Sequence, residues 1–336
     1  MIEPNRNGDL GQLGLLPFDL GYHRSIKGMW MDSLYEKHID NLEFSQTECD
    51  STILIIGDSF SEQERGGFTN FLTEFFPGYK VCVLWTGDGE ITKYQLFINR
   101  LLEDKPLPRT VIIESVERHL TNNLYLLDME AHPEIEKNVP SADPETKPTT
   151  VKEPESSKIK EMANSIVECK DDLKDNFLHT QEYVKRNVGV ADNPVKHLKL
   201  KQELFTCKGA EDDLYFYWED LEKVDKSKID KAKQNLDALM SATEKKGIKI
   251  LFVVPSDKYD LYKDFAKKNK NKKVKPQLDF YTEYNSNSRF LNCKELLYPH
   301  VANGEKDIYK CHDSHWSPIG AKYAAEEIKR KLDSQK

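Results

Sequence analysis

Residues 52–60 read Thr-Ile-Leu-Ile-Ile-Gly-Asp-Ser-Phe, and this stretch decides the fold class. Its first five residues are β-branched or aliphatic, which is typical of a strand that is buried on both faces of a parallel sheet. Gly57 permits a tight turn directly after this strand. Ser59 therefore follows the carboxyl end of a predicted strand, where open α/β sheets bind their ligands.

Strand and helix patterns alternate after this stretch. Apolar residues recur at helical spacing over 68–76 and 91–102, and strand-like runs cover 80–85 and 110–113. This order predicts a parallel sheet with helices on its faces. The pattern resumes near the C-terminus with a helix over 229–243, a strand over 249–254, a helix over 258–267 and a last helix capped by Ser317-Pro318.

The middle of the chain interrupts this alternation. Five prolines lie between Pro133 and Pro154, mixed with Glu, Lys, Ser and Thr, which is typical of a solvated loop or linker. Highly charged residues follow, with helical stretches around 159–184. We expect an N-terminal extension over 1–50 that packs on the domain, a catalytic domain built from 51–124 and 226–336, and a charged insertion or cap over 125–225.

The composition excludes several classes of protein. The chain has 336 residues, of which 38% are hydrophobic, and this is enough for a core. Its net charge of −8 argues against an electrostatic nucleic-acid binder. No run approaches the roughly 18–20 apolar residues of a transmembrane helix. The polar N-terminus is not a secretory signal, so the chain is either cytosolic or trimmed of an export segment.

A second group of polar residues lies just before the last predicted helix, where the sequence reads Asp313-Ser314-His315-Trp316. In extended backbone, residues i and i+2 point the same way, so the Asp313 carboxylate can orient the His315 ring. These are the base and the orienting acid of a serine triad, and Trp316 could wall the pocket. Taken alone, Ser59 also fits an ordinary turn and His315 a structural cap, but together they predict a triad.

Further residues are candidates for binding the substrate or the oxyanion. The backbone N–H groups of Ser59 and of the Gly87–Gly89 turn could stabilise an oxyanion, although that glycine pair also fits a simple turn. Glu114 and Arg118 are four residues apart, and we favour a helical ion pair between them over a direct role in catalysis. The candidate substrate contacts are Asp58, Trp316, Glu114, Arg118 and Lys258.

Metal chemistry is a weaker interpretation. The six cysteines include no CxxC pair, so zinc-ribbon spacing is absent. His312, Asp313 and His315 carry side chains that ligate metals, but a metal site there would leave Ser59 without a role. We therefore expect no metal site and no cofactor.

The two motifs resemble the SGNH (GDSL-like) hydrolase superfamily, in which the nucleophile lies in GDS and the acid and base lie in a C-terminal DxxH or DxH. They are most similar to the SGNH-like proteins of polysaccharide O-acetylation, of the AlgX/AlgJ type, and to bacterial DHHW-motif proteins. Those proteins carry GDSF and D-x-H-W-[ST]-P-x-G-A. The matching stretches here are 57–60 (GDSF), 313–321 (DSHWSPIGA), 114–118 (ESVER) and 254–259 (VPSDKY).

The chain departs from this family pattern in two respects. In AlgX/AlgJ-type proteins the DxHW element precedes GDSF, whereas here it follows. The asparagine that usually serves the SGNH oxyanion hole, in a GxND block after the third strand, is replaced by residues 114–118. The resemblance therefore does not carry over the alginate substrate.

The resemblance implies an SGNH-like three-layer α/β sandwich with a mostly parallel sheet and a charged, partly helical insertion. It also implies an O-acetyltransferase or acetylesterase that acts on a cell-surface or exported polysaccharide through an acetyl-Ser59 intermediate. A transferase would need acetyl from a membrane-bound O-acyltransferase partner, which implies a periplasmic or cell-envelope location. The alternatives are a catalytically idle SGNH scaffold that binds glycan or assembles an acetylation complex, and a lipase or thioesterase.

Overall fold

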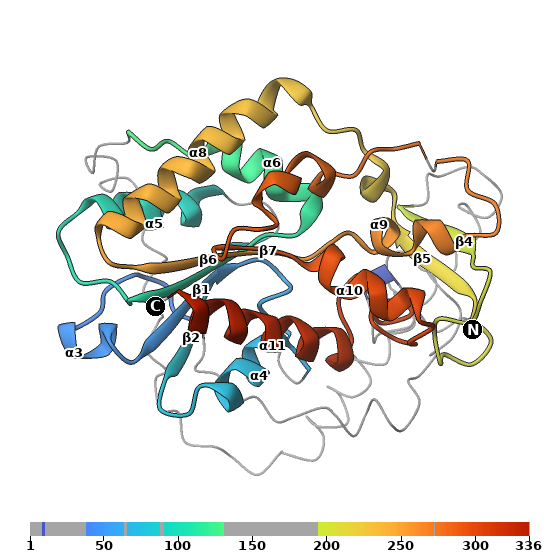
Figure 1. Cartoon of the computed structure of the whole chain (residues 1–336), viewed down its shortest axis with the longest axis horizontal. Helices are drawn as coiled ribbons and strands as arrows, with labels where there is room; N and C mark the ends of the chain where they lie inside the picture. The colour runs from blue at the N-terminus through green and yellow to red at the C-terminus, as the bar shows by residue number, and fades with distance from the viewer. Residues whose placement is uncertain are drawn as a thin grey trace, which may run out of the picture.

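The computed structural model describes residues 9–10, 38–63, 66–87, 91–130, 194–271 and 273–335. Its centre is a five-stranded sheet in the order β2-β1-β3-β6-β7, and every neighbouring pair of strands is parallel (Figure 1). The expected α/β fold with a mostly parallel sheet is confirmed. The strands are β1 (Thr52–Gly57), β2 (Lys80–Trp85), β3 (Thr110–Glu114), β6 (Lys249–Val254) and β7 (Phe290–Asn292).

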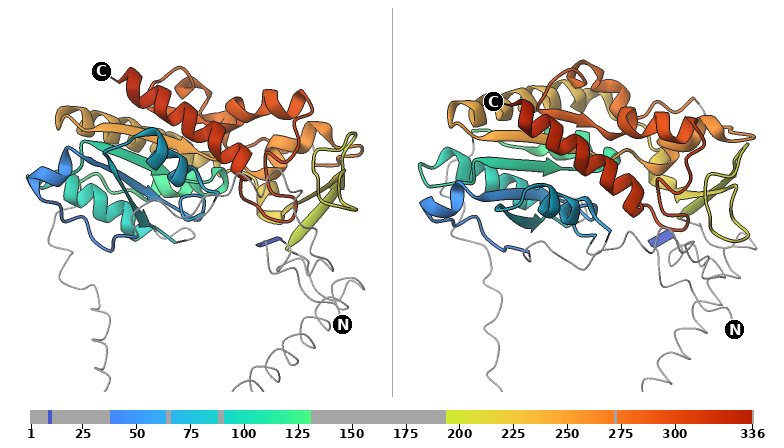
Figure 2. Two further views of the ribbon diagram at one scale, coloured as in Figure 1. Left: turned by 90° about the horizontal axis from the view of Figure 1, so that it is seen from below. Right: turned by 60° about the horizontal axis from the view of Figure 1, so that its bottom comes forward.

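Helices cover both faces of this sheet (Figures 1 and 2). In β1, Ile53 and Ile55 pack with the helices of one face, while Leu54 and Ile56 pack with those of the other. This alternation follows from the period of two along a strand, and it explains why β1 is apolar throughout. One face carries α5 (Ile91–Leu102), α6 (Glu117–Leu126) and α8 (Lys226–Lys245), and the other carries α4 (Phe68–Phe75), α10 (Cys293–Ala302) and α11 (Pro318–Ser334).

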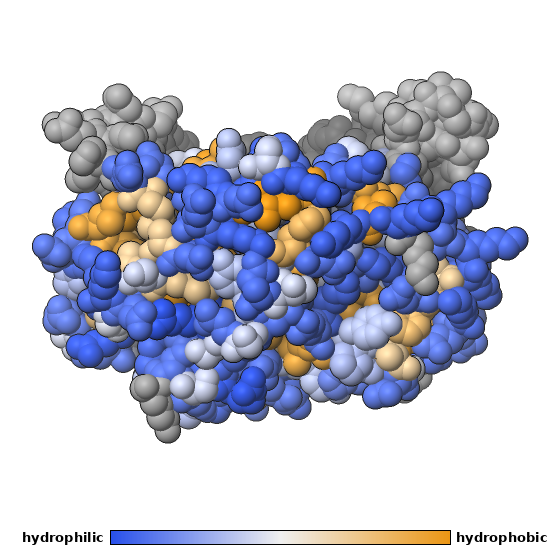
Figure 3. All heavy atoms as spheres, turned by 45° about the horizontal axis from the view of Figure 1, so that its top comes forward, coloured by the Kyte–Doolittle hydropathy of each residue, from blue (hydrophilic) through white to orange (hydrophobic). Residues whose placement is uncertain are grey.

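The helix layers are amphipathic. Figure 3 shows a face on which hydrophilic residues predominate and separate the hydrophobic patches from one another. The apolar side of α8 lies against the sheet, where Leu236 and Leu239 are buried. Across the described residues, no helix is long and apolar enough to cross a membrane.

A second, smaller sheet lies beyond the main one. It pairs β4 (Val195–Lys199) with β5 (Asp213–Tyr217) in antiparallel fashion, next to α9 (Lys258–Tyr262) (Figure 1). Leu204 and Phe216 of this region belong to the same apolar cluster as α4 and α11. The pair therefore packs on the main sheet, although it falls inside the predicted insertion. The helical stretches expected around 159–184 lie outside the described residues.

The remaining elements are short. Helix α9 ends earlier than the helix expected over 258–267, because the chain tightens into a 3₁₀ turn. In the predicted N-terminal extension, the Ile39 amide bonds to the Val83 carbonyl, which attaches this segment to β2. The short elements are α3 (Gln46–Cys49) and four 3₁₀ turns, Trp218–Leu221, Lys263–Phe265, Leu278–Phe280 and Thr282–Tyr284.

The strand order positions the site. The chain leaves β1 toward β2 on one side, and β3 then pairs with β1 on the other side. In open α/β sheets a crevice forms at the carboxyl ends of the strands where the order reverses. Here that place lies between the ends of β1 and β3, and Ser59 follows the first of these.

Candidate active site

The turn that carries Ser59 is held by a buried carboxylate. Asp58 accepts hydrogen bonds from the Phe60 amide at 3.1 Å and from the Val116 amide at 2.9 Å. These bonds tie the turn after β1 to the start of α6 and leave Ser59 partly exposed. Asp58 was predicted to contact substrate. The structure instead shows its side chain buried with both oxygens bonded to backbone, so it positions the turn that carries Ser59.

Glu114 supports the same turn from β3. Its Oε2 accepts from the Asp58 amide at 3.0 Å and from the Ser61 hydroxyl at 2.8 Å. Burial, and then the neighbouring Asp58 charge, raise the pKa of Glu114 well above its usual range. A Cβ on Gly57 would lie 2.2 Å from the Ser61 oxygen and 2.6 Å from Glu114 Oε2, so this close approach requires glycine.

The histidine and its acid meet the serine. His315 Nε2 lies 2.8 Å from Ser59 Oγ, and its Nδ1 lies 2.6 Å from Asp313 Oδ1. The His315 amide also donates to Asp313 at 2.9 Å. Because an ionised carboxylate only accepts, Nδ1 carries the proton and Nε2 is free to accept from the serine hydroxyl. The three side chains thus form a continuous hydrogen-bonded series, Ser59–His315–Asp313.

The charges in this series favour a proton acceptor. Burial opposes the charge of Asp313, but Lys310 and His315 outweigh it and hold its pKa well below the usual range. Burial also opposes a charged His315, yet the Asp313 carboxylate outweighs this and raises the pKa of the imidazole. A buried carboxylate that stays ionised therefore increases the proton affinity of the ring beside Ser59.

Lys258 holds the loop that carries Asp313 and His315. Its ammonium donates to the carbonyl oxygens of Lys310 and Cys311, both at 2.7 Å, and to that of Asp313 at 3.1 Å. We predicted that Lys258 contacts substrate. The structure corrects this, because the side chain is buried and its three hydrogens point into the loop. Lys258 is a positioning residue.

Trp316 is placed differently from our expectation. Its ring is fully buried and packs edge-on against Phe60, with ring centroids 5.0 Å apart. It therefore does not wall the pocket. Phe60 lies between Trp316 and His315, because the centroid of its ring is also 4.8 Å from that of the His315 ring. The aromatic residue beside the imidazole is thus the one in the GDSF motif.

Arg118 does not pair with Glu114. Glu114 is the last residue of β3 and not helical, so the predicted i,i+4 geometry does not arise. Arg118 instead bonds to Asp257 at 3.0 Å, and its guanidinium lies 5.2 Å from the centre of the Tyr217 ring. Burial raises the pKa of Asp257 to about 6 even though Arg118 opposes the shift. The charge of Arg118 is therefore paired with the Asp257 carboxylate inside the protein.

Asp9 also lies at the site, although no local sequence pattern marks it. Its Oδ1 accepts from the Ser314 amide at 2.7 Å, its Oδ2 accepts from the Ser314 hydroxyl, and Oδ2 lies 3.7 Å from His315 Nδ1. Asp9, Asp313 and His315 could together hold a cation. Both nitrogens of His315, however, already bond to Asp313 and Ser59. His312, which was considered as a metal ligand and rejected, lies instead with Cys311 and a second cysteine.

The oxyanion candidates lie around the same turn. The amide and the hydroxyl of Thr86 both donate to the Gly57 carbonyl, at 2.8 and 3.1 Å, so the turn after β2 adjoins the turn that carries Ser59. Gly87 has a positive φ of 69°, which glycine adopts without strain. Gly89 lies outside the described residues. The role of this turn as an oxyanion donor stays a prediction.

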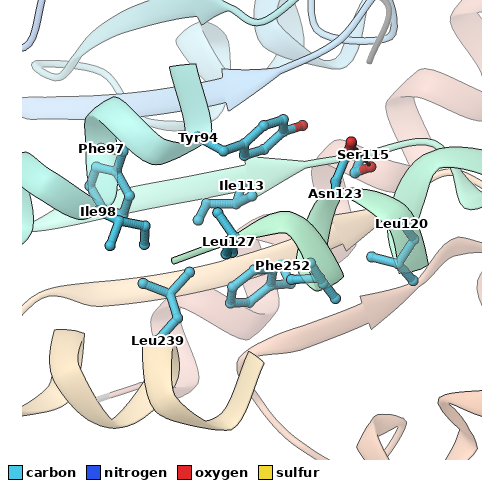
Figure 4. Close-up of a pocket in the computed structure, with 11 residues that line it drawn as sticks. Tyr94, Phe97, Ile98, Ile113, Ser115, Leu120, Asn123, Leu127, Leu239 and Phe252 are labelled. Atoms are coloured by element: carbon cyan, nitrogen blue, oxygen red, sulfur yellow. Dashed lines mark hydrogen bonds between the residues drawn. The ribbon is translucent and has the colours of Figure 1, made fainter. Parts of the chain in front are cut away.

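A small apolar cavity lies on the face of the sheet that carries α5, α6 and α8 (Figure 4). Tyr94, Phe97, Leu239 and Phe252 point toward it. Its volume is about 20 Å³, which is room for roughly one water. This cavity is too small to accept the acyl chain of a lipase or thioesterase substrate.

Comparison with protein families supports the predicted fold. Residues 207–336 match the family described as SGNH hydrolase-like domain, acetyltransferase AlgX. The matched part runs from before β5 through α11 and contains Asp313 and His315, whereas Ser59 lies outside it. No curated protein and no solved structure matches the chain. This match supports the resemblance to AlgX-type SGNH domains over that part of the chain.

Proposed function

We propose that this AlgX-type SGNH domain moves acetyl groups to or from an exported or cell-surface polysaccharide through an acetyl-Ser59 intermediate. The observation that carries the proposal is the series Ser59–His315–Asp313, with contacts of 2.8 and 2.6 Å. It lies where the order of the sheet reverses, and Ser59 is partly exposed there. An idle scaffold would have no use for all three groups at bonding distance.

In the proposed reaction, Ser59 Oγ attacks the carbonyl carbon of an acetyl ester while its proton passes to His315 Nε2. Asp313 stabilises the imidazolium that forms. The amide of Ser59, with a second donor in the turn at Gly87, bonds to the oxyanion. The tetrahedral intermediate then collapses, and the leaving alkoxide takes the proton from His315. Acetyl remains on Ser59 as an ester.

The second half of the reaction decides between the two activities. A sugar hydroxyl that attacks acetyl-Ser59 gives an O-acetyltransferase, and water gives an esterase. His315 serves as base for either nucleophile, so exclusion of water and affinity for the acceptor determine the outcome. Transfer would need a supply of activated acetyl. We assign that supply to a membrane-bound O-acyltransferase partner and place the protein at the cell envelope.

The experiment is turnover of p-nitrophenyl acetate, followed by intact-mass measurement of the protein. We expect the wild type to release nitrophenol and to gain one acetyl group on Ser59. Ser59→Ala and His315→Ala should lose both signals. The matched control is His197→Ala, which removes an imidazole from β4 whose ring bonds to Asp213 and not to the Ser59–His315–Asp313 series. Added acetyl-acceptor oligosaccharides then separate transfer from hydrolysis.

Two results would contradict the proposal. Activity that survives both substitutions would place the chemistry elsewhere. A wild type as inert as its variants toward aryl acetates and acetylated oligosaccharides would favour the scaffold.

A further inference from the structure

A pair of thiols lies directly behind the loop that carries Asp313. Cys207 lies between β4 and β5, and Cys311 lies two residues before Asp313. Both side chains are fully buried and both thiols are free in this structure. The two sulfur atoms and one ring nitrogen of His312 all lie within 4.8 Å of one another. Two cysteines from distant parts of the sequence thus meet in the core.

We propose that Cys207 and Cys311 form a disulfide that links the segment between β4 and β5 to the catalytic loop. The proposal does not depend on the proposed acetyl chemistry. One thiolate attacks a sulfur of a disulfide oxidant, such as oxidised glutathione or a thiol–disulfide oxidoreductase, and releases one thiol. The second thiolate attacks the mixed disulfide and releases the other. The two cysteines lose two protons, and two electrons pass to the oxidant.

The surroundings favour a cross-link over a metal. Structural zinc sites are almost always four-coordinate. In the part of the chain that the structure describes, this cluster offers three ligand atoms. The Lys258 ammonium lies close by, since it donates to the carbonyl oxygens of Cys311 and Asp313. A fixed positive charge next to the sulfur atoms opposes a second cation, whereas a disulfide is neutral.

The burial of the pair determines when it can oxidise. The pKa of Cys207 is raised, first by its hydrogen bond with Cys311 and then by burial. A buried thiol of raised pKa holds little thiolate and is closed to an oxidant. Oxidation therefore belongs to folding or to transient opening of the loop. Once formed, the disulfide would hold the loop from the side of β4 and β5, while Lys258 holds the same loop from α9.

The test is oxidative refolding of the full chain in a mixture of reduced and oxidised glutathione, then tryptic digestion without reduction. We expect one linked pair of peptides, Gln202–Lys208 with Cys311–Lys322, which is two hydrogens lighter than the separate peptides and disappears after reduction. Cys49, Cys82 and Cys293 serve as internal controls, and each should be alkylated after unfolding. The oxidised protein should melt about 5–10 °C above the reduced one.

Cys207→Ser supplies the second measurement. Its melting temperature should not respond to the redox state, because Cys311 has lost its partner. Quantitative alkylation of both residues after oxidative refolding would overturn the proposal. So would linkage of either residue to a different cysteine. Reduced wild type that binds one equivalent of added Zn²⁺ tightly, with loss of binding in Cys207→Ser, would identify a metal site instead.

Discussion

At the scale of single residues, His315 determines how activity depends on pH. In the proposed reaction the neutral ring is the base, and its pKa lies above the usual value of about 6.5 because Asp313 outweighs the effect of burial. Activity should therefore rise with pH and reach half its maximum above pH 6.5. The measurement is kcat/KM for p-nitrophenyl acetate from pH 5 to 9. A half-maximum below pH 6 would contradict the geometry of the pair.

Asp313→Asn tests the Asp313–His315 pair by changing its acid. The amide cannot supply the charge that raises the pKa of His315, and it can donate to Nδ1 and reverse the tautomer. We expect kcat to fall by about 10⁴-fold, as when the corresponding carboxylate is lost from serine triads. The pH at which any residual activity reaches half its maximum should move to a lower value. Asp264→Asn, on the 3₁₀ turn after α9, is the control for loss of a carboxylate elsewhere.

At the scale of elements, Glu114 links the stability of β1 and β3 to pH. Its folded pKa is raised above an unfolded value of about 4.3, so between the two values the folded chain holds a proton that the unfolded chain has lost. Stability contributed in this way is present below pH 4 and falls as the pH rises through the folded pKa. Glu114→Gln mimics the protonated acid at every pH.

The melting temperature of the wild type should therefore decline relative to that of Glu114→Gln as the pH rises from 5 to 8. Thermal unfolding of both proteins across this range measures the difference. The part of this difference that does not change with pH reports packing. The part that changes with pH reports the proton on Glu114. A difference that does not change with pH would show that Glu114 is ionised in the folded protein.

Lys258 joins α9 to the catalytic loop. Lys258→Met keeps the length of the side chain but leaves three carbonyl oxygens without their donor. An unpaired buried group costs about 1–3 kcal/mol, so we expect a loss of at least roughly 3 kcal/mol in the free energy of unfolding. In urea titrations the midpoint should fall. At temperatures where the variant stays folded, kcat should fall more than KM rises, because the loop positions His315.

The same elements show what the sequence could predict. β1, the turn after it and the capped start of α11 are local patterns, so Ser59, Asp313 and His315 could be selected together from their residue types and places. Asp9 and Lys258 act through contacts with distant backbone, and no local pattern marks such contacts. Trp316 reads as a pocket residue beside His315, but adjacent side chains point opposite ways and its ring enters the core. The packing of β5 against α9 is likewise a tertiary contact that no local pattern marks.

At the scale of the whole molecule, α11 must approach the rest of the chain closely. A Cβ on Gly320 would lie 2.4 Å from the Ile308 carbonyl oxygen, which is backbone and cannot turn away. Gly320→Ala should cost about 1–3 kcal/mol of stability and displace the start of α11, with His315 three residues before it. Chemical unfolding and kcat should both report the change. Lys322→Ala, on the same helix, should leave both nearly unaltered.

The family match covers one of the two motifs. The matched residues, 207–336, contain Asp313 and His315, while Ser59 follows β1 far upstream. In the AlgX/AlgJ-type pattern that these motifs resemble, the DxHW element comes first. A linear comparison can align one of two transposed halves, but the parallel sheet brings both to one edge irrespective of their order.

The placement of Ser59 near the first strand and of His315 beside the last helix has a consequence for biosynthesis. A ribosome makes the serine long before the histidine, and the serine hydroxyl has no base until α11 docks against the sheet. In the proposed reaction, an incompletely synthesised chain therefore has no base for Ser59 and cannot take up acetyl. The enzyme that we propose becomes reactive only when its last helix has folded, and turnover reports that its assembly is complete.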